Sequence, residues 1–190
     1  MYHVHKINKK LRRLIFIFRR IKLLNNDKIT KMLYYSFAQS ILQYGIISWG
    51  YAYKTTIKSL CRAQNILLRI IMNKDNLYHS DLLYDEYQVL NIRYLYLYRV
   101  LYFINKNHIF YSIPRINSNT RQNGDAVLYI CNLNIVQHST LALEPKLINI
   151  LPNELTNVNP FNKLILKLRF QEFIKTQFCR ENISKLICID

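Results

Sequence analysis

The side chains best suited to metal-assisted chemistry in this sequence are three carboxylates within six positions, Asp81, Asp85 and Glu86. Two-metal phosphoryl transfer needs such carboxylates clustered, so that they hold the ions about 4 Å apart. These three lie in a short amphipathic pattern that predicts a helix, on which Asp81 and Asp85 share one face. We therefore interpret the cluster as a solvated helix face that balances nearby cations, and we assign it no catalytic role.

Histidine and cysteine offer no better site. His3 and His5 form an H-x-H, the other histidines are scattered, and the four cysteines contain no C-x-x-C pair. Zinc needs three or four ligands at tight spacing. Motifs such as G-x-x-x-x-G-K and G-x-S-x-G are absent. We expect no metal or other cofactor in this chain and no catalysis by the chain alone. Without a secretory leader or paired cysteines, we expect an intracellular protein, nuclear or cytoplasmic.

Basic side chains are far more abundant than acidic ones. The chain has 27 Lys and Arg against 11 Asp and Glu, a net charge of +16 that favours an anionic partner, either nucleic acid or an acidic membrane surface. Ten of the basic residues lie within residues 1–31, where Asp27 is the only acid. The candidate nucleic-acid-binding residues in this segment are Lys6, Lys9, Lys10, Arg12, Arg13, Arg19, Arg20 and Lys22.

The same segment has the pattern of an amphipathic helix. An apolar stripe recurs every three or four residues, and basic residues occupy the remaining surface. The stripe consists of Ile7, Leu11, Leu14, Phe18 and Ile21. One interpretation of the basic face is a solvated surface; the other is a binding surface. Like charges at i,i+4 oppose helix formation, so a face of one sign loses stability unless an anion neutralises it. We favour the binding surface, because cations bind phosphates by releasing counterions whatever the base sequence.

The elements that would position these residues are mainly helices. Three Gly and four Pro leave few turns in 190 residues, which argues against a sandwich or barrel of short strands. After a break at Asn25–Asp27, with Asp27 as N-cap, a second helical stripe is expected at Ile29, Leu33, Phe37, Ile41 and Tyr44. Tyr34, Tyr35 and Trp49 are assigned to packing.

Later helices are expected at three further places. The first has Thr55 or Thr56 as its cap and a stripe at Ile57, Leu60, Leu67, Leu68 and Ile71. A short one is capped by Ser80. A third runs from Ile92 to Asn105, where alternating Tyr and Leu leaves a strand as the alternative.

The C-terminal part of the chain, from about residue 107, has a different sequence pattern. Pro114 and the polar residues 117–125 indicate a loop, and Val127–Val136 is β-branched enough for a short strand. Leu143–Pro145 is expected to interrupt regular structure, and Phe161–Phe178 is expected to form a final helix.

One stretch of the chain could be a membrane span. Residues 32–53 carry no charged side chain and are long enough to span a bilayer. Central Gln and Ser are costly in hydrocarbon, so we favour a buried helix followed by a turn. The alternative is a small basic protein that lies on or inserts into a membrane.

The same stretch resembles a known family. Tyr34–Gly50, with Gln39-Ser40-Ile41-Leu42-Gln43-Tyr44-Gly45-Ile46 at its centre, is similar to the region just after the polymerase palm in reverse transcriptases of non-LTR retrotransposons, the jockey-like elements of animals. Collinear similarities extend over nearly the whole chain. They comprise His5–Arg20, Leu60 with Gln64-Asn65 and Leu68-Arg69-Ile70-Ile71, Leu90–Ile92, Arg121-Gln122, Glu144–Leu147 with Leu151-Pro152, and Phe161–Leu168.

The resemblance implies a mainly α fold, a thumb-like helical bundle at 1–110 followed by a small irregular α+β C-terminal extension at 111–190. In the family this region grips the primer–template duplex, which implies contact of the basic helix with the backbone of a duplex or RNA–DNA hybrid. The sequence departs from the family at Glu144 and Ile148, where the tail motif usually has Gly and Trp.

The sequence also lacks the family's fingers, palm and Tyr-x-Asp-Asp turn, so the catalytic carboxylates and their divalent metal would belong to the missing palm. We therefore expect a fragment of an RNA-directed DNA polymerase that is inactive alone. A palm supplied by an upstream or separate chain, and a translated transposon relic with no selected function, stay open.

Overall fold

A computed structural model of the 190-residue chain describes residues 2–24, 26–107, 116–117, 125–128, 140–150, 168–169 and 172–173. Within these residues the fold is mainly helical, as the sequence predicts, and β-type pairing is confined to a single bridge residue, Ala126. The chain divides into two compact units, residues 1–95 and residues 96–190.

The first helix, α1 (Tyr2–Ile21), buries the stripe that its sequence predicts. Ile7, Leu11, Leu14 and Phe18 are buried, and Ile21 is half-buried. Because these residues recur every three or four positions, they fall on one side of the helix and leave the opposite side free for polar groups. The helix ends in a short 3₁₀ turn, η1 (Lys22–Leu24).

Residues 26–50 form a series of short helical segments. They are α2 (Asp27–Leu33), the π-helix η2 (Tyr34–Gln39), α3 (Ser40–Gln43) and α4 (Ile46–Trp49). The N-cap of α2 is Asn26, whose side-chain oxygen accepts a hydrogen bond from the Ile29 amide at 3.1 Å. The expectation that Asp27 caps this helix is therefore wrong by one position, and Asp27 instead places a negative charge in the first turn, where the helix dipole favours it.

The buried stripe of this stretch also differs from the prediction. Ile29, Phe37 and Tyr44 are exposed, whereas the buried positions are Thr30, Tyr34, Ala38, Leu42 and Ile46. A spacing of four residues drifts around an α-helix of 3.6 residues per turn. The wider turns of the π-helix compensate this drift, so the set stays on one face.

Gly45 makes the turn between α3 and α4. Its backbone is left-handed, with φ 60° and ψ 19°, a conformation that glycine adopts without a Cβ penalty. Trp49 is buried beside this turn, and its indole nitrogen donates to the Tyr44 carbonyl at 2.8 Å. Tyr34 is also buried and Tyr35 is half-buried, in line with the packing role expected for these aromatic residues.

The long helix α5 (Lys54–Met72) forms the centre of the first unit. It buries the predicted residues Ile57, Leu60, Leu67, Leu68 and Ile71. Its N-cap is Tyr53, which makes no side-chain capping bond. The expectation that Thr55 or Thr56 caps this helix is therefore wrong, because both residues lie inside it.

The next helix, α6 (Ser80–Tyr87), likewise includes the residue expected to cap it. His79 is the N-cap of α6, and Ser80 is its first residue. The Ser80 hydroxyl instead accepts a hydrogen bond from the Asn65 side chain of α5 at 3.0 Å. This contact ties α6 to α5.

Both α5 and α6 end in the same hydrogen-bonded motif. Asn73 follows α5 with φ 55°, and the Lys74 amide reaches back to the Arg69 carbonyl at 3.0 Å. Gln88 follows α6 with φ 58° and makes the equivalent turn. This is the Schellman arrangement, in which a left-handed residue satisfies the last helical carbonyls.

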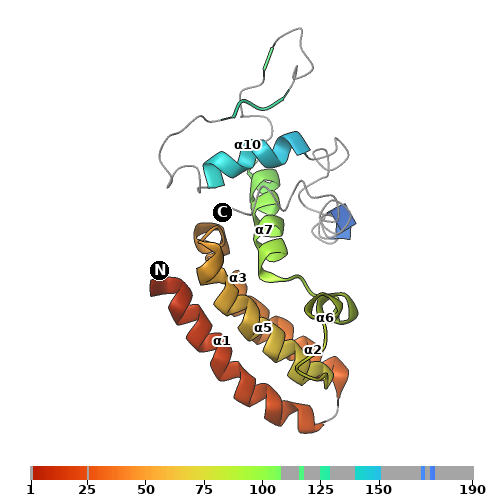
Figure 1. The fold of residues 1–190 in the computed structure, drawn as a ribbon. Coiled ribbons are helices and arrows are strands. Elements are labelled where there is room, and N and C mark those ends of the chain that lie inside the picture. The colour runs from red at the N-terminus through yellow and green to blue at the C-terminus, as the bar shows by residue number, and fades with distance from the viewer. Residues whose placement is uncertain are drawn as a thin grey trace. The chain divides into compact units, whose positions relative to one another are not determined.

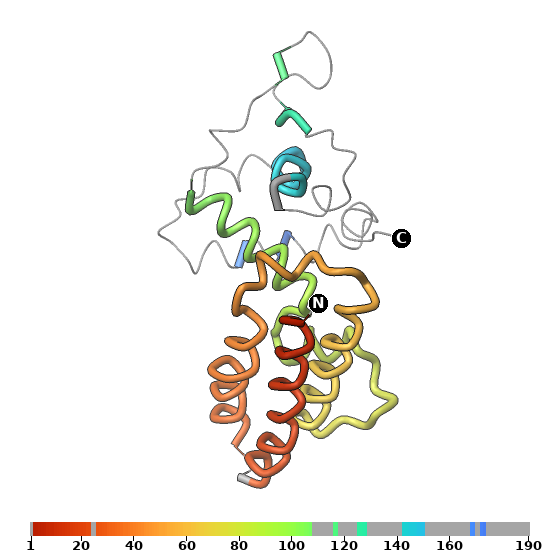
Figure 2. The backbone as a smooth tube through the Cα atoms, turned by 90° about the vertical axis from the view of Figure 1, so that its left-hand side faces the viewer, coloured from red at the N-terminus to blue at the C-terminus, as the bar shows by residue number. Residues whose placement is uncertain are grey.

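Helices α1 and α5 run in the same direction (Figures 1 and 2). The segments α2 to α3 run back in the opposite direction along the flank of α1 that does not face α5. Two side-chain hydrogen bonds fix the register of α1 and α5. Asn8 donates to Ser59 at 3.3 Å, and Lys22 donates to Asn73. Each pair is separated by 51 positions, so residue i of α1 lies beside residue i + 51 of α5.

Helix α7 (Ile92–Lys106) forms where the sequence left a strand as the alternative. In the second unit, α10 (Thr140–Ile150) continues through Pro145, so the expectation that Leu143–Pro145 interrupts regular structure is wrong. An internal proline costs roughly 3 kcal/mol. The large buried side chains of this helix, Leu143, Leu147 and Ile148, each contribute about 1.5–3 kcal/mol and offset that cost. Ala142 is buried beside them.

Asn149 of α10 holds an extended segment by two hydrogen bonds. Its side-chain oxygen accepts from the Ala126 amide at 2.7 Å, and its nitrogen donates to the Ala126 carbonyl at 3.1 Å. Most of the predicted strand Val127–Val136 lies outside the described residues. The predicted helix Phe161–Phe178 is described only at 168–169 and 172–173, which are helical.

Candidate nucleic-acid interface

The candidate basic residues lie on the surface of α1. Seven are exposed and belong to the helix, and the eighth, Lys22, is half-buried in η1. The exposed seven are Lys6, Lys9, Lys10, Arg12, Arg13, Arg19 and Arg20. The burial of the apolar stripe therefore turns the seven basic residues of α1 toward solvent.

Four of these residues form a row opposite the buried stripe. At 3.6 residues per turn, Lys6, Lys9, Arg13 and Arg20 fall within about 60° of one another around the helix axis. We call them the outer row. With a rise of 1.5 Å per residue, the row extends for about 21 Å, which matches the axial rise of about six base pairs.

The remaining basic residues of α1 occupy its two flanks. Arg12 and Arg19 lie on the flank that faces α5, the same flank from which Asn8 reaches Ser59. Lys10 lies on the opposite flank, where the His3 ring packs against Tyr44 at a centroid distance of 5.9 Å. All seven positions fit within half of the helix circumference, so the helix presents one continuous cationic side.

The electrostatics of α1 are unfavourable for the free protein. The helix contains no acidic residue, and among the described residues none of its cations forms an ion pair. Like-charge pairs at i,i+4, such as Lys6–Lys10 and Lys9–Arg13, each cost about 0.2–0.5 kcal/mol. The helix dipole favours the two arginines of the last turn, Arg19 and Arg20, but it does not reach the lysines further back. A bound polyanion would remove the cost of the like-charge pairs.

An exposed aromatic residue lies within this cationic side, and the sequence analysis missed it. Phe16 is 70% exposed, and the Arg19 guanidinium lies 5.9 Å from its ring centre. Ile17 and Leu23 are also exposed. The sequence could have predicted this exposure, because Phe16 lies between Leu14 and Phe18 of the buried stripe and so falls on another side of the helix. Basic and apolar side chains together can contact a nucleobase, or can enter a lipid headgroup layer.

The acidic cluster of α6 has a structural role. Asp81, Asp85 and Glu86 are exposed, while Tyr84 is buried against α5. Glu86 accepts a hydrogen bond from the Tyr78 hydroxyl and lies 3.0 Å from the Lys74 ammonium. These two contacts, the first being the stronger, hold the pKa of Glu86 below its usual value. The carboxylate is thus engaged by its neighbours on the solvated face expected for it.

Two structural findings bear on metals and membranes. Within the described residues, no three His, Cys, Asp or Glu side chains come together in a way that could hold a metal ion. No helix in the described part of the chain has both the length and the apolar character needed to cross a membrane.

Comparison of the chain with protein-family models, with curated protein sequences and with solved structures finds no match. The evidence for function therefore comes from the geometry of α1 and its neighbours and from the residues themselves.

Proposed function

We propose that this chain binds nucleic acid through the phosphate backbone, without sequence preference, and that the cationic side of α1 is the contact surface. One observation carries the proposal. Seven exposed cations share one side of a single helix that contains no acid, and none of them forms an ion pair among the described residues. Such a surface gains affinity for phosphates by releasing condensed counterions.

The partner we propose is a duplex or an RNA–DNA hybrid. The outer row is about 21 Å long, which suits a rod-shaped polyanion, and α1 is held by its buried stripe and by the Asn8–Ser59 hydrogen bond. The motif resemblance to retrotransposon reverse transcriptases supports the same partner. On that basis we propose that the chain is the thumb and post-thumb part of an RNA-directed DNA polymerase whose catalytic palm lies elsewhere.

The decisive experiment measures the affinity of the full chain for a labelled RNA–DNA hybrid across a salt series. We expect log K to fall linearly with log salt, with a slope of several units, because each neutralised phosphate contributes about 0.9 on B-form DNA. The variant R12E/R13E/R19E/R20E should lower that slope by about three units or more, since it reverses four charges on α1.

A matched control separates location from net charge. The variant K28E/K54E/K58E/K106E reverses four exposed lysines outside α1 and changes the net charge by the same amount. It should retain most of the slope. Equal losses in the two variants, or a wild-type slope near zero, would contradict the proposal.

Catalysis by the isolated chain is tested separately. We expect no product in a primer-extension assay with Mg²⁺ or Mn²⁺, because the proposed enzyme's metal-binding carboxylates belong to the palm. Metal-dependent synthesis by the isolated chain would overturn this part of the proposal.

A second candidate function is binding to an anionic membrane surface. Phe16, Ile17 and Leu23 are exposed beside the cations, an arrangement that also suits an interfacial helix. Co-sedimentation with vesicles that contain anionic lipid, at the same salt as the hybrid-binding assay, distinguishes the two functions. Tighter binding to vesicles than to the hybrid would favour the membrane.

A further inference from the structure

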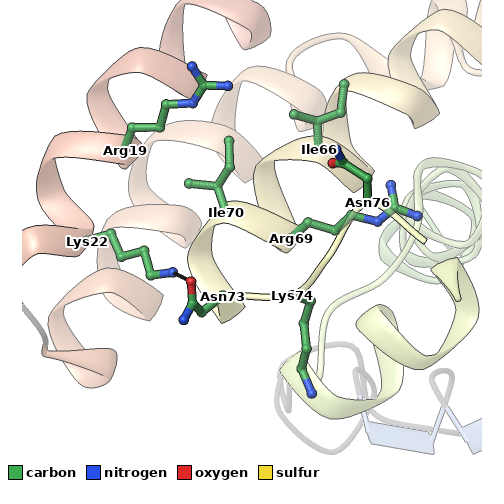
Figure 3. A pocket seen from close by; sticks show the side chains of 8 residues that line it. All are labelled: Arg19, Lys22, Ile66, Arg69, Ile70, Asn73, Lys74 and Asn76. Atoms are coloured by element: carbon green, nitrogen blue, oxygen red, sulfur yellow. Dashed lines mark hydrogen bonds between the residues drawn. The ribbon is translucent and has the colours of Figure 1, made fainter. Parts of the chain in front are cut away.

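A pocket of about 310 Å³ lies in the first unit where the C-terminal ends of α1 and α5 meet (Figure 3). Its lining combines two apolar side chains, two amides and four cations from three segments of chain. These residues are Ile66 and Ile70, Asn73 and Asn76, and Arg19, Lys22, Arg69 and Lys74. Of these, only Arg19 and Lys22 belonged to the predicted site, because the others approach α1 only when α5 packs beside it.

The pocket has a positive balance of charge. No described acidic side chain lines it. Lys22 donates to the neutral amide of Asn73, so its charge is not offset by a carboxylate. Lys74 is paired with Glu86, and the C-terminal ends of two helices supply about half a negative charge each. Against four cations these terms leave about two positive charges, which is enough to attract a phosphate group.

The cations of the pocket are held in place to different degrees. The Arg69 guanidinium donates to the Tyr78 carbonyl at 2.8 Å and to the Ser80 hydroxyl at 3.3 Å, so it is fixed toward α6. Lys22 is fixed by Asn73, whose left-handed backbone is set by the end of α5. Arg19 is exposed and extends from α1 above Ile70 (Figure 3). Arg69 is held toward α6 and Lys74 is paired with Glu86, so Arg19 and Lys22 are the cations left to meet an incoming anion.

The shape of the pocket indicates more than a phosphate. A phosphate alone needs donors and positive charge, yet Ile66 and Ile70 form an apolar surface and Ile66 is 42% exposed. A ring of a nucleobase can lie on such a surface, and the amides of Asn73 and Asn76 can both donate and accept hydrogen bonds. The volume is at the lower limit of the roughly 300–1,000 Å³ of small-ligand sites, so it suits one nucleotide and not a duplex.

We propose that this pocket binds a single unpaired nucleotide, with the phosphate between Arg19 and Lys22 and the base against Ile66 and Ile70. The inference rests on the proposed function, because Arg19 is adjacent in sequence to Arg20, the last member of the outer row. A strand bound along α1 would then place its unpaired end in the pocket. Duplex contact and end capture would be separate functions of neighbouring residues.

The test is an NMR titration of the full chain, labelled at isoleucine methyl groups, with AMP, adenosine, inorganic phosphate and inositol trisphosphate as separate probes. AMP should shift the Ile66 and Ile70 signals most strongly. Arg19→Ala and Lys22→Ala should each weaken AMP binding about tenfold, the size of one charge-assisted hydrogen bond. Lys54→Ala, an exposed lysine at the start of α5 that belongs to neither α1 nor the pocket, is the control and should change AMP binding less than about twofold.

Each other outcome overturns the inference in a recognisable way. Equal affinity for AMP and inorganic phosphate would show a simple anion site. Tighter binding of inositol trisphosphate than of AMP would assign the pocket to a lipid headgroup. If AMP shifts neither isoleucine while hybrid binding keeps its salt dependence, the pocket proposal fails and the proposed function stands. If hybrid binding is also absent, the proposed function fails as well.

Discussion

The side-chain amide of Gln64 donates two hydrogen bonds of 3.0 Å, one to the hydroxyl of Tyr34 and one to the carbonyl of Leu90. Gln64 and Tyr34 are almost fully buried. The Tyr84 hydroxyl of α6 lies between two acceptors on α5, the side-chain oxygen of Asn65 and, at 3.3 Å, that of Gln64. One buried amide thus joins η2, α5, α6 and the segment that precedes α7, and it holds the bundle against which α1 packs.

Replacement of Gln64 by Leu should lower the free energy of unfolding by about 2 kcal/mol, because it leaves the buried Leu90 carbonyl and the Tyr34 hydroxyl without this partner. Tyr34→Phe should cost only about 1 kcal/mol, since the Gln64 amide keeps its bond to Leu90. Thr55→Ala, an exposed change on the same helix, should stay within about 0.5 kcal/mol. Urea unfolding measures all three; a Gln64→Leu protein as stable as wild type would show that the network contributes nothing.

Alkaline pH should unfold the first unit through its buried tyrosines. Burial raises the pKa of Tyr34 well above its ordinary value, only partly opposed by the hydrogen bond from Gln64. The raised pKa means that stability is complete below the unfolded value of about 10 and falls as pH rises above it. Tyr34→Phe should therefore flatten the decline of unfolding temperature between about pH 9 and pH 11. If the decline is the same in Tyr34→Phe as in the wild type, the loss of stability at high pH comes from other groups.

The sequence predicts the fold well where apolar and polar residues are segregated. In α1 the basic residues leave only one choice of buried stripe, and the structure buries Ile7, Leu11, Leu14 and Phe18 as expected. In residues 32–53 no charge distinguishes one face from another, so two apolar stripes one position apart compete. The π-helix η2 buries the stripe that contains Tyr34 and Ala38. No pattern in the local sequence predicts a π-helix at this place.

The candidate site divides in the same way. The cations of α1 could be named from charge alone, because a helix with one buried stripe must expose them. The pocket could not, because it depends on the parallel register of α1 and α5. That register brings Lys22 to Asn73 across 51 positions, a tertiary relationship that no spacing along the chain encodes.

Gly45→Ala should destabilise the turn between α3 and α4 by about 1–2 kcal/mol, the cost of a left-handed backbone for an L-residue. Space is not the reason, since a Cβ at this position would meet the nearest atoms of Trp49 and His3 at ordinary distances of 3.9 and 4.0 Å. Gly45→Asn should cost less, because Asn tolerates this conformation better than Ala. Thermal unfolding of the two variants compares them directly, and equal losses would point to packing instead of backbone strain.

Acid should weaken the contact between α6 and the loop after α5. The Tyr78 hydroxyl, and to a smaller extent Lys74, lower the pKa of Glu86. A lowered pKa gives stability that is present above the unfolded value of about 4.3 and is lost as pH falls through the folded value. Glu86→Gln should therefore reduce the loss of unfolding temperature between about pH 5 and pH 3. Asp75→Asn, a change in the loop after α5, is the control. If it has the same effect as Glu86→Gln, the contacts of Glu86 with Tyr78 and Lys74 are not responsible for the loss of stability in acid.

Phe16 distinguishes the two surfaces that α1 could bind. Phe16 is 70% exposed and its ring centre lies 5.9 Å from the Arg19 guanidinium, so Phe16→Ala should leave the stability of the fold almost unchanged. Backbone binding depends on charge, so the salt slope for the hybrid should be the same in the variant. Insertion into a headgroup layer depends on apolar area, and the loss of a phenyl group should weaken vesicle binding about tenfold or more. Phe37→Ala removes a second exposed ring, on η2, and should affect neither partner. If Phe16→Ala weakens hybrid binding more than about tenfold while the salt slope is unchanged, stacking on a base would replace backbone contact as the main source of affinity.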